Sequence, residues 1–208
     1  MTKIYLTRHG QTVWNLEKRM QGHGESKLTE LGRKQARWLG EHLNNVHIDK
    51  IVSSSSGRTE ETSRLIRGNR PIAIELNPQL REIHLGEWEG KLQHELQSEF
   101  SEAYRNFWED PLRYETSGGE SLEELVARVS HEVEHIAETY KGQTILIVTH
   151  GVVLKALMIY FKKRGIEELW SGAFMHHSTC LSLVEKTDGE WKIHMEGDTT
   201  HYQEELSH

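Results

Sequence analysis

Two apolar segments of the chain end with a histidine followed by a glycine. The first, at the N-terminus, ends in Arg8-His9-Gly10, and the second, in the C-terminal half, ends in His150-Gly151. In an open α/β sheet, ligands bind outside the carboxyl ends of the strands. Two histidines at that edge, one of them beside an arginine, would form a compact cationic and nucleophilic pocket. One such segment alone could be an ordinary strand end with a turn glycine, but the pair predicts a phosphate site.

The chemistry that such a pocket supports is phosphoryl transfer. Hydrolysing a phosphate monoester requires charge compensation on three equatorial oxygens, an in-line nucleophile and a proton for the leaving alkoxide. His9 is the predicted nucleophile, because a covalent phosphohistidine splits one difficult step into two easier ones. Arg8 and Arg58 offer planar forks of N–H donors that match a phosphate group. His150, as imidazolium, is expected to bind an equatorial oxygen, and since these groups supply the positive charge, neither a metal ion nor another cofactor is expected.

Three further polar residues complete the predicted site. Asn15 and Gln21 would donate neutral hydrogen bonds to the phosphate, although either could instead cap a helix or turn. Glu82 is the predicted general acid, which protonates the leaving oxygen and later activates water against phosphohistidine. It could also be an ordinary surface carboxylate. Arg58 follows four serines near a predicted helix start, where backbone N–H groups and the helix dipole would add to the same anion site.

The elements that must position these residues alternate between strands and helices along most of the chain. Ser121 and Glu124 fit a capping box at the start of an amphipathic helix. The uncharged, β-branched segment 145–149 is typical of a strand buried on both faces, and residues 187–189 predict a hairpin turn. We expect strands at 3–8, 50–54, 72–76, 145–149, 179–185 and 191–196, and helices at 29–43, from the serines at 53–56 to residue 66, over much of 91–117, at 121–140 and at 152–162.

These elements predict an α/β fold with three layers. Strands and helices alternate along most of the chain, and a hairpin follows at its C-terminal end. This order favours a mainly parallel sheet with an antiparallel edge, covered by helices on both faces. The chain has no low-complexity linker, so we expect a single domain over residues 1–208. Residues 91–117, which are rich in aromatic side chains, are expected to form a helical cap over the site. Whether those aromatic side chains line the pocket or the core is left open by the sequence.

Composition limits the classes of protein and of partner. The 208 residues are 36% hydrophobic and 27% charged, which is typical of one soluble globular domain. No apolar run approaches the roughly 20 residues that span a bilayer, and the first strand begins too early for a signal peptide, so we expect a cytoplasmic protein that makes no membrane contact. The net charge of −7 disfavours nucleic acid as a partner. The single cysteine, Cys180, is expected to be buried and inert, and the oligomeric state is left open.

Five sequence blocks occur in the order found in a known enzyme family. They are Thr7-Arg8-His9-Gly10; Met20-Gln21-Gly22 with Leu28-Thr29-x-x-Gly32; Ser53-Ser54-x-x-x-Arg58-x-x-x-Thr62; Leu80-Arg81-Glu82-Ile83-x-x-Gly86-x-Trp88-Glu89-Gly90; and Val148-Thr149-His150-Gly151. Together they span nearly the whole chain, which resembles the histidine phosphatase superfamily, also called phosphoglycerate mutase-like. The resemblance implies that fold, small-molecule phosphate monoesters as substrates, a phosphohistidine on His9, and phosphate contacts from Gly22 and Gly151.

The resemblance covers two activities, hydrolysis of monoesters and phosphoryl transfer between glycerate oxygens. Ile83, Leu85 and Val152 stand where the mutases carry Arg, Tyr and Asn, so this chain lacks polar groups that a small, triply charged substrate would need. We therefore expect a phosphatase of broad specificity, similar to the PhoE-type phosphatases of bacilli. The alternatives are a cofactor-dependent phosphoglycerate mutase, a dedicated metabolite phosphatase such as an α-ribazole phosphatase, and an inactive binding protein of the same fold.

Residues 131–135 match H-E-x-x-H, the helical zinc motif of metalloproteases. His131 and His135 would share one helix face. That face lies opposite the apolar stripe of the helix, and no third ligand can be identified from the sequence. We therefore predict no metal site here.

Overall fold

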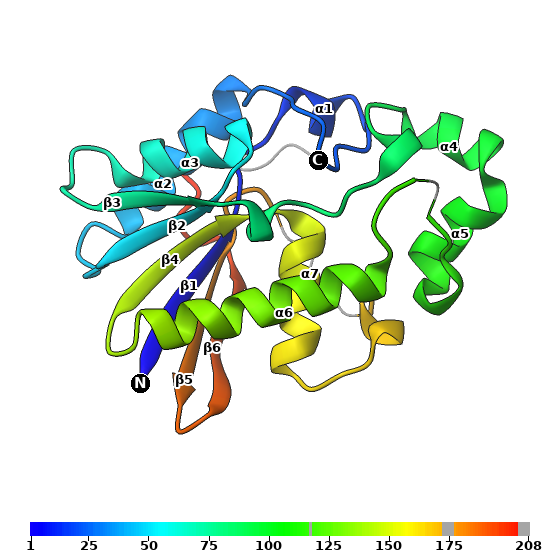
Figure 1. Cartoon of the computed structure of the whole chain (residues 1–208). Helices are drawn as coiled ribbons and strands as arrows, with labels where there is room; N and C mark the ends of the chain where they lie inside the picture. The colour runs from blue at the N-terminus through cyan, green and yellow to red at the C-terminus, as the bar shows by residue number, and fades with distance from the viewer. Residues whose placement is uncertain (117, 172–176, 204–208) are drawn as a thin grey trace.

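A six-stranded mixed sheet, in the order β3-β2-β4-β1-β5-β6, carries the fold (Figure 1). The computed structural model describes residues 1–116, 118–171 and 177–203. Strands β3, β2, β4 and β1 are parallel, and β5 and β6 form the antiparallel edge, as predicted. The strands are β1 (Thr2–Arg8), β2 (Lys50–Ser54), β3 (Ala73–Asn77), β4 (Thr144–Thr149), β5 (Leu181–Thr187) and β6 (Glu190–Asp198).

The register of the two central strands places the predicted histidines side by side. Arg8 of β1 pairs with Thr149 of β4, and the backbone N–H of His9 donates to the Thr149 carbonyl at 3.0 Å. His9 and His150 each follow their strand directly, and their ring centroids are 5.4 Å apart. The carboxyl edge of the parallel strands is therefore the place where the candidate residues meet.

Helices cover both faces of the sheet, α2 and α3 on one and α6 and α7 on the other (Figure 1). Strand β4 is buried between them: Leu146 and Val148 belong to the core beneath α2 and α3, and Ile145 and Ile147 to the core beneath α6 and α7. All four side chains are fully buried, so each stabilises the fold by roughly 1.5–3 kcal/mol. The helices are α1 (Val13–Leu16), α2 (Glu30–His42), α3 (Gly57–Arg67), α4 (Gln93–Glu99), α5 (Ser101–Glu109), α6 (Leu122–Thr139) and α7 (Gly151–Phe161), with short 3-10 turns η1 (Pro78–Leu80), η2 (Gly86–Trp88), η3 (Pro111–Arg113) and η4 (Ile166–Glu168).

Local chemistry sets several element ends. The Thr29 side chain accepts the Gly32 N–H at the start of α2, and Ser121 with Glu124 forms the predicted capping box of α6. Such caps stabilise a helix by about 0.5–2 kcal/mol. In the β5–β6 hairpin, Asp188 and Gly189 both have positive φ, +52° and +85°, which the tight two-residue hairpin turn requires.

Residues 91–117 are largely helical, as predicted, and contain α4, α5 and η3; residue 117 lies outside the described part of the chain. Their aromatic side chains divide between core and pocket. Trp88 is buried in the core, and its ring centroid lies 5.5 to 6.1 Å from four others, while Phe107 and Trp108 also line the pocket described below. The rings around Trp88 are those of Phe100, Tyr104, Phe107 and Tyr114.

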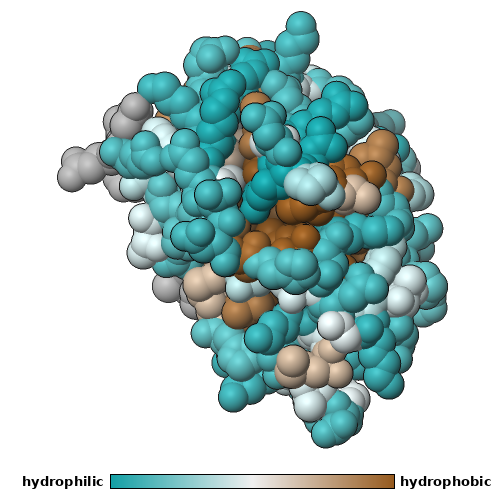
Figure 2. Space-filling model, turned by 90° about the vertical axis from the view of Figure 1, so that its left-hand side faces the viewer, coloured by the Kyte–Doolittle hydropathy of each residue, from teal (hydrophilic) through white to brown (hydrophobic). Residues whose placement is uncertain are grey.

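Figure 2 shows one face of the protein, where hydrophilic side chains surround hydrophobic side chains that gather mainly near the centre. Among the described helices, none has the length and apolar character to cross a bilayer. His131 and His135 are exposed on α6, and no cluster of potential metal ligands occurs within the described residues. Cys180 is buried, as expected.

Candidate active site

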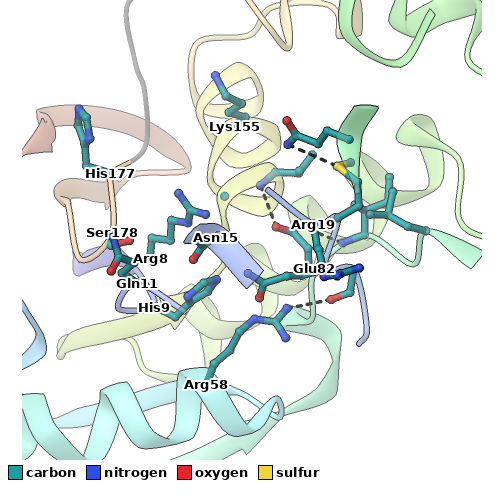
Figure 3. A pocket seen from close by; sticks show the side chains of 18 of the residues that line it. Arg8, His9, Gln11, Asn15, Arg19, Arg58, Glu82, Lys155, His177 and Ser178 are labelled. Atoms are coloured by element: carbon teal, nitrogen blue, oxygen red, sulfur yellow. Dashed lines mark hydrogen bonds between the residues drawn. The ribbon is translucent and has the colours of Figure 1, made fainter. Parts of the chain in front are cut away.

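A pocket of about 620 Å³ opens at the carboxyl edge of the sheet, where α4 and α5 approach β1, α3 and α7. Most of the residues predicted for the site line it together, and Figure 3 shows several of their side chains converging. His150 is the exception, because it is fully buried and lies behind the pocket wall. The predicted residues that line the pocket are Arg8, His9, Asn15, Gln21, Gly22, Arg58, Glu82 and Gly151.

His9 is held as a neutral imidazole. Its Nδ1 lies 2.8 Å from the Gly10 carbonyl oxygen, and since a carbonyl only accepts, Nδ1 carries the proton. Burial, followed by the charges of Arg58 and Arg8, keeps the pKa of His9 well below its ordinary value. The lone pair of Nε2 is therefore available for attack on an electrophile near neutral pH.

The loop that carries His9 is fixed by close contacts to two helices. The Gly10 N–H donates to Thr62 Oγ1 at 3.1 Å, and the Thr62 hydroxyl donates to the Arg58 carbonyl one turn earlier on α3. A Cβ atom on Gly10 would lie 2.4 Å from the Gly32 carbonyl oxygen of α2, so only glycine allows this approach. Thr62 belongs to the sequence block that carries Arg58, but residue type and spacing alone did not predict its contact with Gly10.

Arg58 is a buried and firmly oriented cation. Its Nη1 donates to the Gly24 carbonyl and its Nη2 to the Gly22 carbonyl, both at 2.8 Å. Its Nε is buried without a hydrogen-bond partner. Burial lowers the pKa of Arg58 to about 10, although the Glu82 carboxylate acts in the opposite direction. The guanidinium thus remains charged near neutral pH, and its Nε–H is left as a donor for a ligand.

His150 differs from the expectation of an imidazolium. Arg58 Nη2 lies 3.1 Å from His150 Nδ1, and since a guanidinium only donates, Nδ1 must be unprotonated. The proton is then on Nε2, which lies 2.8 Å from Ser54 Oγ. Burial and the charge of Arg58 keep the pKa of His150 well below its ordinary value. The ring is therefore neutral here, and it orients Arg58.

Asn15 and Gln21 both lie at the pocket and both contact Thr12. The Asn15 side-chain oxygen accepts the Thr12 N–H and hydroxyl, each at 3.0 Å, in the capping box of α1. Its NH₂ group is therefore the part left for a ligand. Gln21 donates to Thr12 Oγ1, and its own Oε1 is buried without a partner. Asn15 thus fills both roles that the sequence left open, the cap and the pocket wall.

Glu82 lies buried on the pocket wall at the start of α7. Its carboxylate accepts the Val152 N–H at 3.1 Å, the Val153 N–H at 3.3 Å and the Ile83 N–H at 3.0 Å. Glu82 thereby caps α7 from a distant part of the chain, because the first N–H groups of a helix lack partners within the helix. The alternative of an exposed surface carboxylate is wrong.

The start of α3 does not serve the pocket in the way predicted. Ser56 is the N-cap residue, but its side chain makes no capping hydrogen bond. The first N–H of the helix, on Gly57, is exposed and faces the Glu25 carboxylate at 3.3 Å. An acidic side chain therefore occupies the helix terminus that was expected to contact the phosphate.

The pocket has two halves of different character. The polar half includes Arg8, His9, Asn15, Gln21 and Arg58, and the apolar half includes Ile83, Leu85, Phe107, Trp108, Val152 and Trp170, with the cation Lys155 beside them. The sequence analysis singled out Ile83, Leu85 and Val152, left the aromatic side chains of residues 91–117 open between pocket and core, and did not predict Lys155 or Trp170. The Lys155 ammonium lies 5.6 Å from the Trp170 ring centroid. The helical spacing of Lys155, one turn after Gly151 on α7, was a signal that could have placed it at the pocket.

Known proteins resemble this chain over most of its length. The model of the Histidine phosphatase superfamily (branch 1) matches residues 4–199. The solved structure of Bacillus stearothermophilus YhfR is 43% identical, with a TM-score of 0.94 over 97% of this chain and 99% of that one. Phosphoserine phosphatase 1 of Hydrogenobacter thermophilus is 32% identical over 82% of this chain and 81% of its own. Phosphoglycerate mutase-like protein 4 of Arabidopsis thaliana is 31% identical over 97% of this chain and 87% of its own.

A neutral, buried imidazole near two arginine side chains, at the carboxyl edge of an α/β sheet, is a site suited to phosphoryl transfer. The extent of the family match and the identity to the relatives show the family: the chain belongs to the histidine phosphatase superfamily.

Proposed function

We propose that the protein hydrolyses phosphate monoesters of small molecules through a covalent phosphohistidine on His9. The observation that carries the proposal is the state of His9, whose Nδ1–H is fixed to the Gly10 carbonyl while Nε2 keeps its lone pair in the pocket. A nucleophile of this kind needs neither an added base nor a change of tautomer before it attacks.

In the first step, His9 Nε2 attacks phosphorus and the bond to the ester oxygen breaks. The guanidinium groups of Arg8 and Arg58, with the amides of Asn15 and Gln21, stabilise the charge on the equatorial oxygens. The Glu82 carboxyl group donates a proton to the leaving alkoxide, so the alcohol departs neutral. In the second step, Glu82 takes a proton from water, and that water displaces His9 and releases inorganic phosphate.

His150 acts in this proposal through Arg58. The Nδ1 atom of His150 accepts from the Arg58 guanidinium, which binds the phosphate in this proposal. His150 therefore fixes the orientation of the Arg58 side chain. A direct contact between His150 and a phosphate oxygen, which the sequence predicted, would require Nε2 to exchange its Ser54 partner. That direct contact stays a prediction, as do the contacts of Gly22 and Gly151.

Broad specificity is the form of the function that the apolar half supports. Ile83, Leu85 and Val152 all line the pocket, and they offer no hydrogen bonds to a substrate carboxylate or hydroxyl. An apolar wall of this kind discriminates weakly between organic groups. It therefore favours a broad phosphatase over a mutase or a phosphatase of one metabolite, and the complete set of reactive residues argues against an inactive binding protein. A cytoplasmic location and independence of metal ions stay predictions.

The test is steady-state phosphate release by EDTA-treated protein from p-nitrophenyl phosphate, glycerol 3-phosphate and 3-phosphoglycerate. We expect turnover of all three, and a protein that carries phosphate on His9 after quenching in alkaline denaturant, because the P–N bond of phosphohistidine is stable in base and labile in acid. Activity confined to one ester would replace broad specificity with a dedicated phosphatase. Interconversion of 2- and 3-phosphoglycerate that requires bisphosphoglycerate, without phosphate release, would make the protein a mutase.

A further inference from the structure

Glu89 lies outside the pocket but joins the two loops that supply its chemistry. One oxygen, Oε1, accepts the His23 N–H at 2.8 Å and the Leu85 N–H at 3.1 Å. The first of these amides belongs to the loop that follows Gln21, and the second to the loop that follows Glu82. Its side chain is 20% exposed, so both hydrogen bonds are largely shielded from water and are correspondingly stronger.

The loop of residues 21–24 depends on this carboxylate for its path. The carbonyl groups on either side of His23, those of Gly22 and Gly24, are the two that hold the Arg58 guanidinium. Gly22 has a φ of +52°, and a Cβ atom there would lie 2.5 Å from Glu89 Oε1. The absence of a side chain at this position is therefore what allows the carboxylate to reach the His23 amide.

The loop of residues 82–85 contacts the same two residues, Glu89 and His23. Besides the bond from the Leu85 N–H to Glu89, the His23 ring nitrogen Nε2 lies 3.0 Å from the Glu82 carbonyl oxygen. A carbonyl only accepts, so this ring nitrogen carries the proton and donates. The loop that carries Glu82 is thus held on one side by His23 at Glu82 and by Glu89 at Leu85, and on the other by the contacts of the Glu82 side chain to α7.

We propose that Glu89 is a positioning residue. It sets the distance between the loop of residues 21–24, which orients Arg58, and the general acid Glu82. The inference rests on the proposed function, because it assumes that Glu82 protonates the leaving group. Misplacing a catalytic group by about 1 Å can cost about a hundredfold in rate. The loss of rate should be larger for esters whose leaving alcohol must be protonated. A good leaving group departs without a proton, so its ester should lose less activity.

The experiment compares kcat/KM for two esters, glycerol 3-phosphate with an alkyl leaving group and p-nitrophenyl phosphate with an aryl one. The value of kcat/KM reports the steps up to the departure of the leaving group, even where the later hydrolysis of the phosphohistidine limits kcat. For Glu89→Ala we expect the alkyl ester to lose at least about tenfold more activity than the aryl ester. Glu89→Gln, which keeps an acceptor oxygen without the charge, should restore the wild-type ratio. Glu123→Ala, which removes an exposed carboxylate on α6, is the matched control and should leave the ratio unchanged.

Two further variants make the result decisive. If Glu89→Ala unfolds, Glu89→Asp keeps the charge but shortens the reach by one methylene, and it should show the same selective loss. Glu82→Gln, measured in parallel, should also lose activity selectively on the alkyl ester. A selective loss for Glu82→Gln, with equal losses or none for Glu89→Ala and Glu89→Asp, would overturn the role of Glu89. Absence of selectivity in Glu82→Gln itself would overturn the acid role in the proposed function, and the inference with it.

Discussion

The polar half and the apolar half of the pocket are held in place by different kinds of contact. In the polar half, Arg58 and His9 are bound through directional hydrogen bonds to backbone carbonyl groups. In the apolar half, Phe107, Trp108 and Trp170 pack ring against ring, with centroids 4.7 to 5.1 Å apart. Directional contacts hold atoms in one geometry, whereas apolar packing tolerates substitution when volume is kept.

This difference separates the reaction from the choice of substrate. The transferring phosphoryl group is the same for every monoester, so the residues around it can be fixed rigidly. The leaving groups differ, and the wall that meets them is apolar and supplied by several segments of the chain. Substitutions in the polar half should therefore lower activity on all esters, and substitutions in the apolar half should change the ratio between them.

The largest effect is expected for His9→Ala. Loss of the nucleophile should lower kcat/KM by at least about 10⁴-fold on every ester, since no covalent intermediate can form. Phosphate release and the mass of protein quenched in alkaline denaturant would measure this. His131→Ala, at an exposed histidine on α6, is the control and should retain full activity. Residual turnover through a phosphorylated protein would place the nucleophile elsewhere.

Glu82→Gln should have the next largest effect on kcat/KM, and the size of the loss should depend on the leaving group of the ester. General acid catalysis contributes about 10²–10⁴-fold, so we expect a loss of that order on an alkyl ester and a smaller one on p-nitrophenyl phosphate. Steady-state kcat/KM for the two esters is the measurement. Unchanged turnover of the alkyl ester would remove Glu82 from the mechanism.

Acid should destabilise the structure behind the polar half. Thr179 donates its N–H to the Arg8 carbonyl and contacts His201 at 3.3 Å, and burial lowers the pKa of His201 to about 4. Below about pH 6.5 the unfolded chain binds a proton at this histidine and the folded chain does not, so stability falls as the pH falls. His201 alone should lower the free energy of unfolding by about 2 kcal/mol at pH 5 relative to pH 8.

Denaturant unfolding at both pH values would measure the loss, with His201→Gln as the comparison. This variant should be less sensitive to acid than the wild type by that amount. His9 and His150, whose pKa values burial also lowers, should keep part of the acid sensitivity in the variant. An identical pH dependence in both proteins would show that His201 does not stay neutral in the fold.

The smallest effect is expected for Lys155→Gln in the apolar half. The Lys155 ammonium should attract a leaving group that carries a carboxylate. Its loss should therefore lower kcat/KM for such an ester by about fivefold, the contribution of a partly exposed ion pair. The matched substrates are 3-phosphoglycerate and glycerol 3-phosphate, which differ by a carboxylate in place of a hydroxymethyl group. Inhibition by inorganic phosphate should stay unchanged, because it reports the polar half. A fall in kcat/KM of equal size for both esters would contradict the separation of the two halves.

Most of the fold followed from local patterns in the sequence. The capping residues Thr29 and Ser121 begin helices where predicted, and the apolar residues of β4 alternate between two cores. These features depend on neighbours within a few residues, so a single sequence contains them. The helix α3 begins after the serines as predicted, but the side chain that faces its first N–H, that of Glu25, comes from a segment 32 residues away, which local patterns do not reveal.

The chain itself determined which reactive groups exist and beside which elements they lie: Arg8 and His9 at the end of β1, and Arg58 at the start of α3, follow from residue type and position. Tertiary structure alone decided their protonation states and their partners. His150 is neutral because folding buries it and presents it with the Arg58 guanidinium, and Glu89 joins two loops because folding brings His23 and Leu85 to one oxygen. Desolvation and hydrogen-bond geometry depend on what surrounds a group in space, and spacing along the chain does not contain that information.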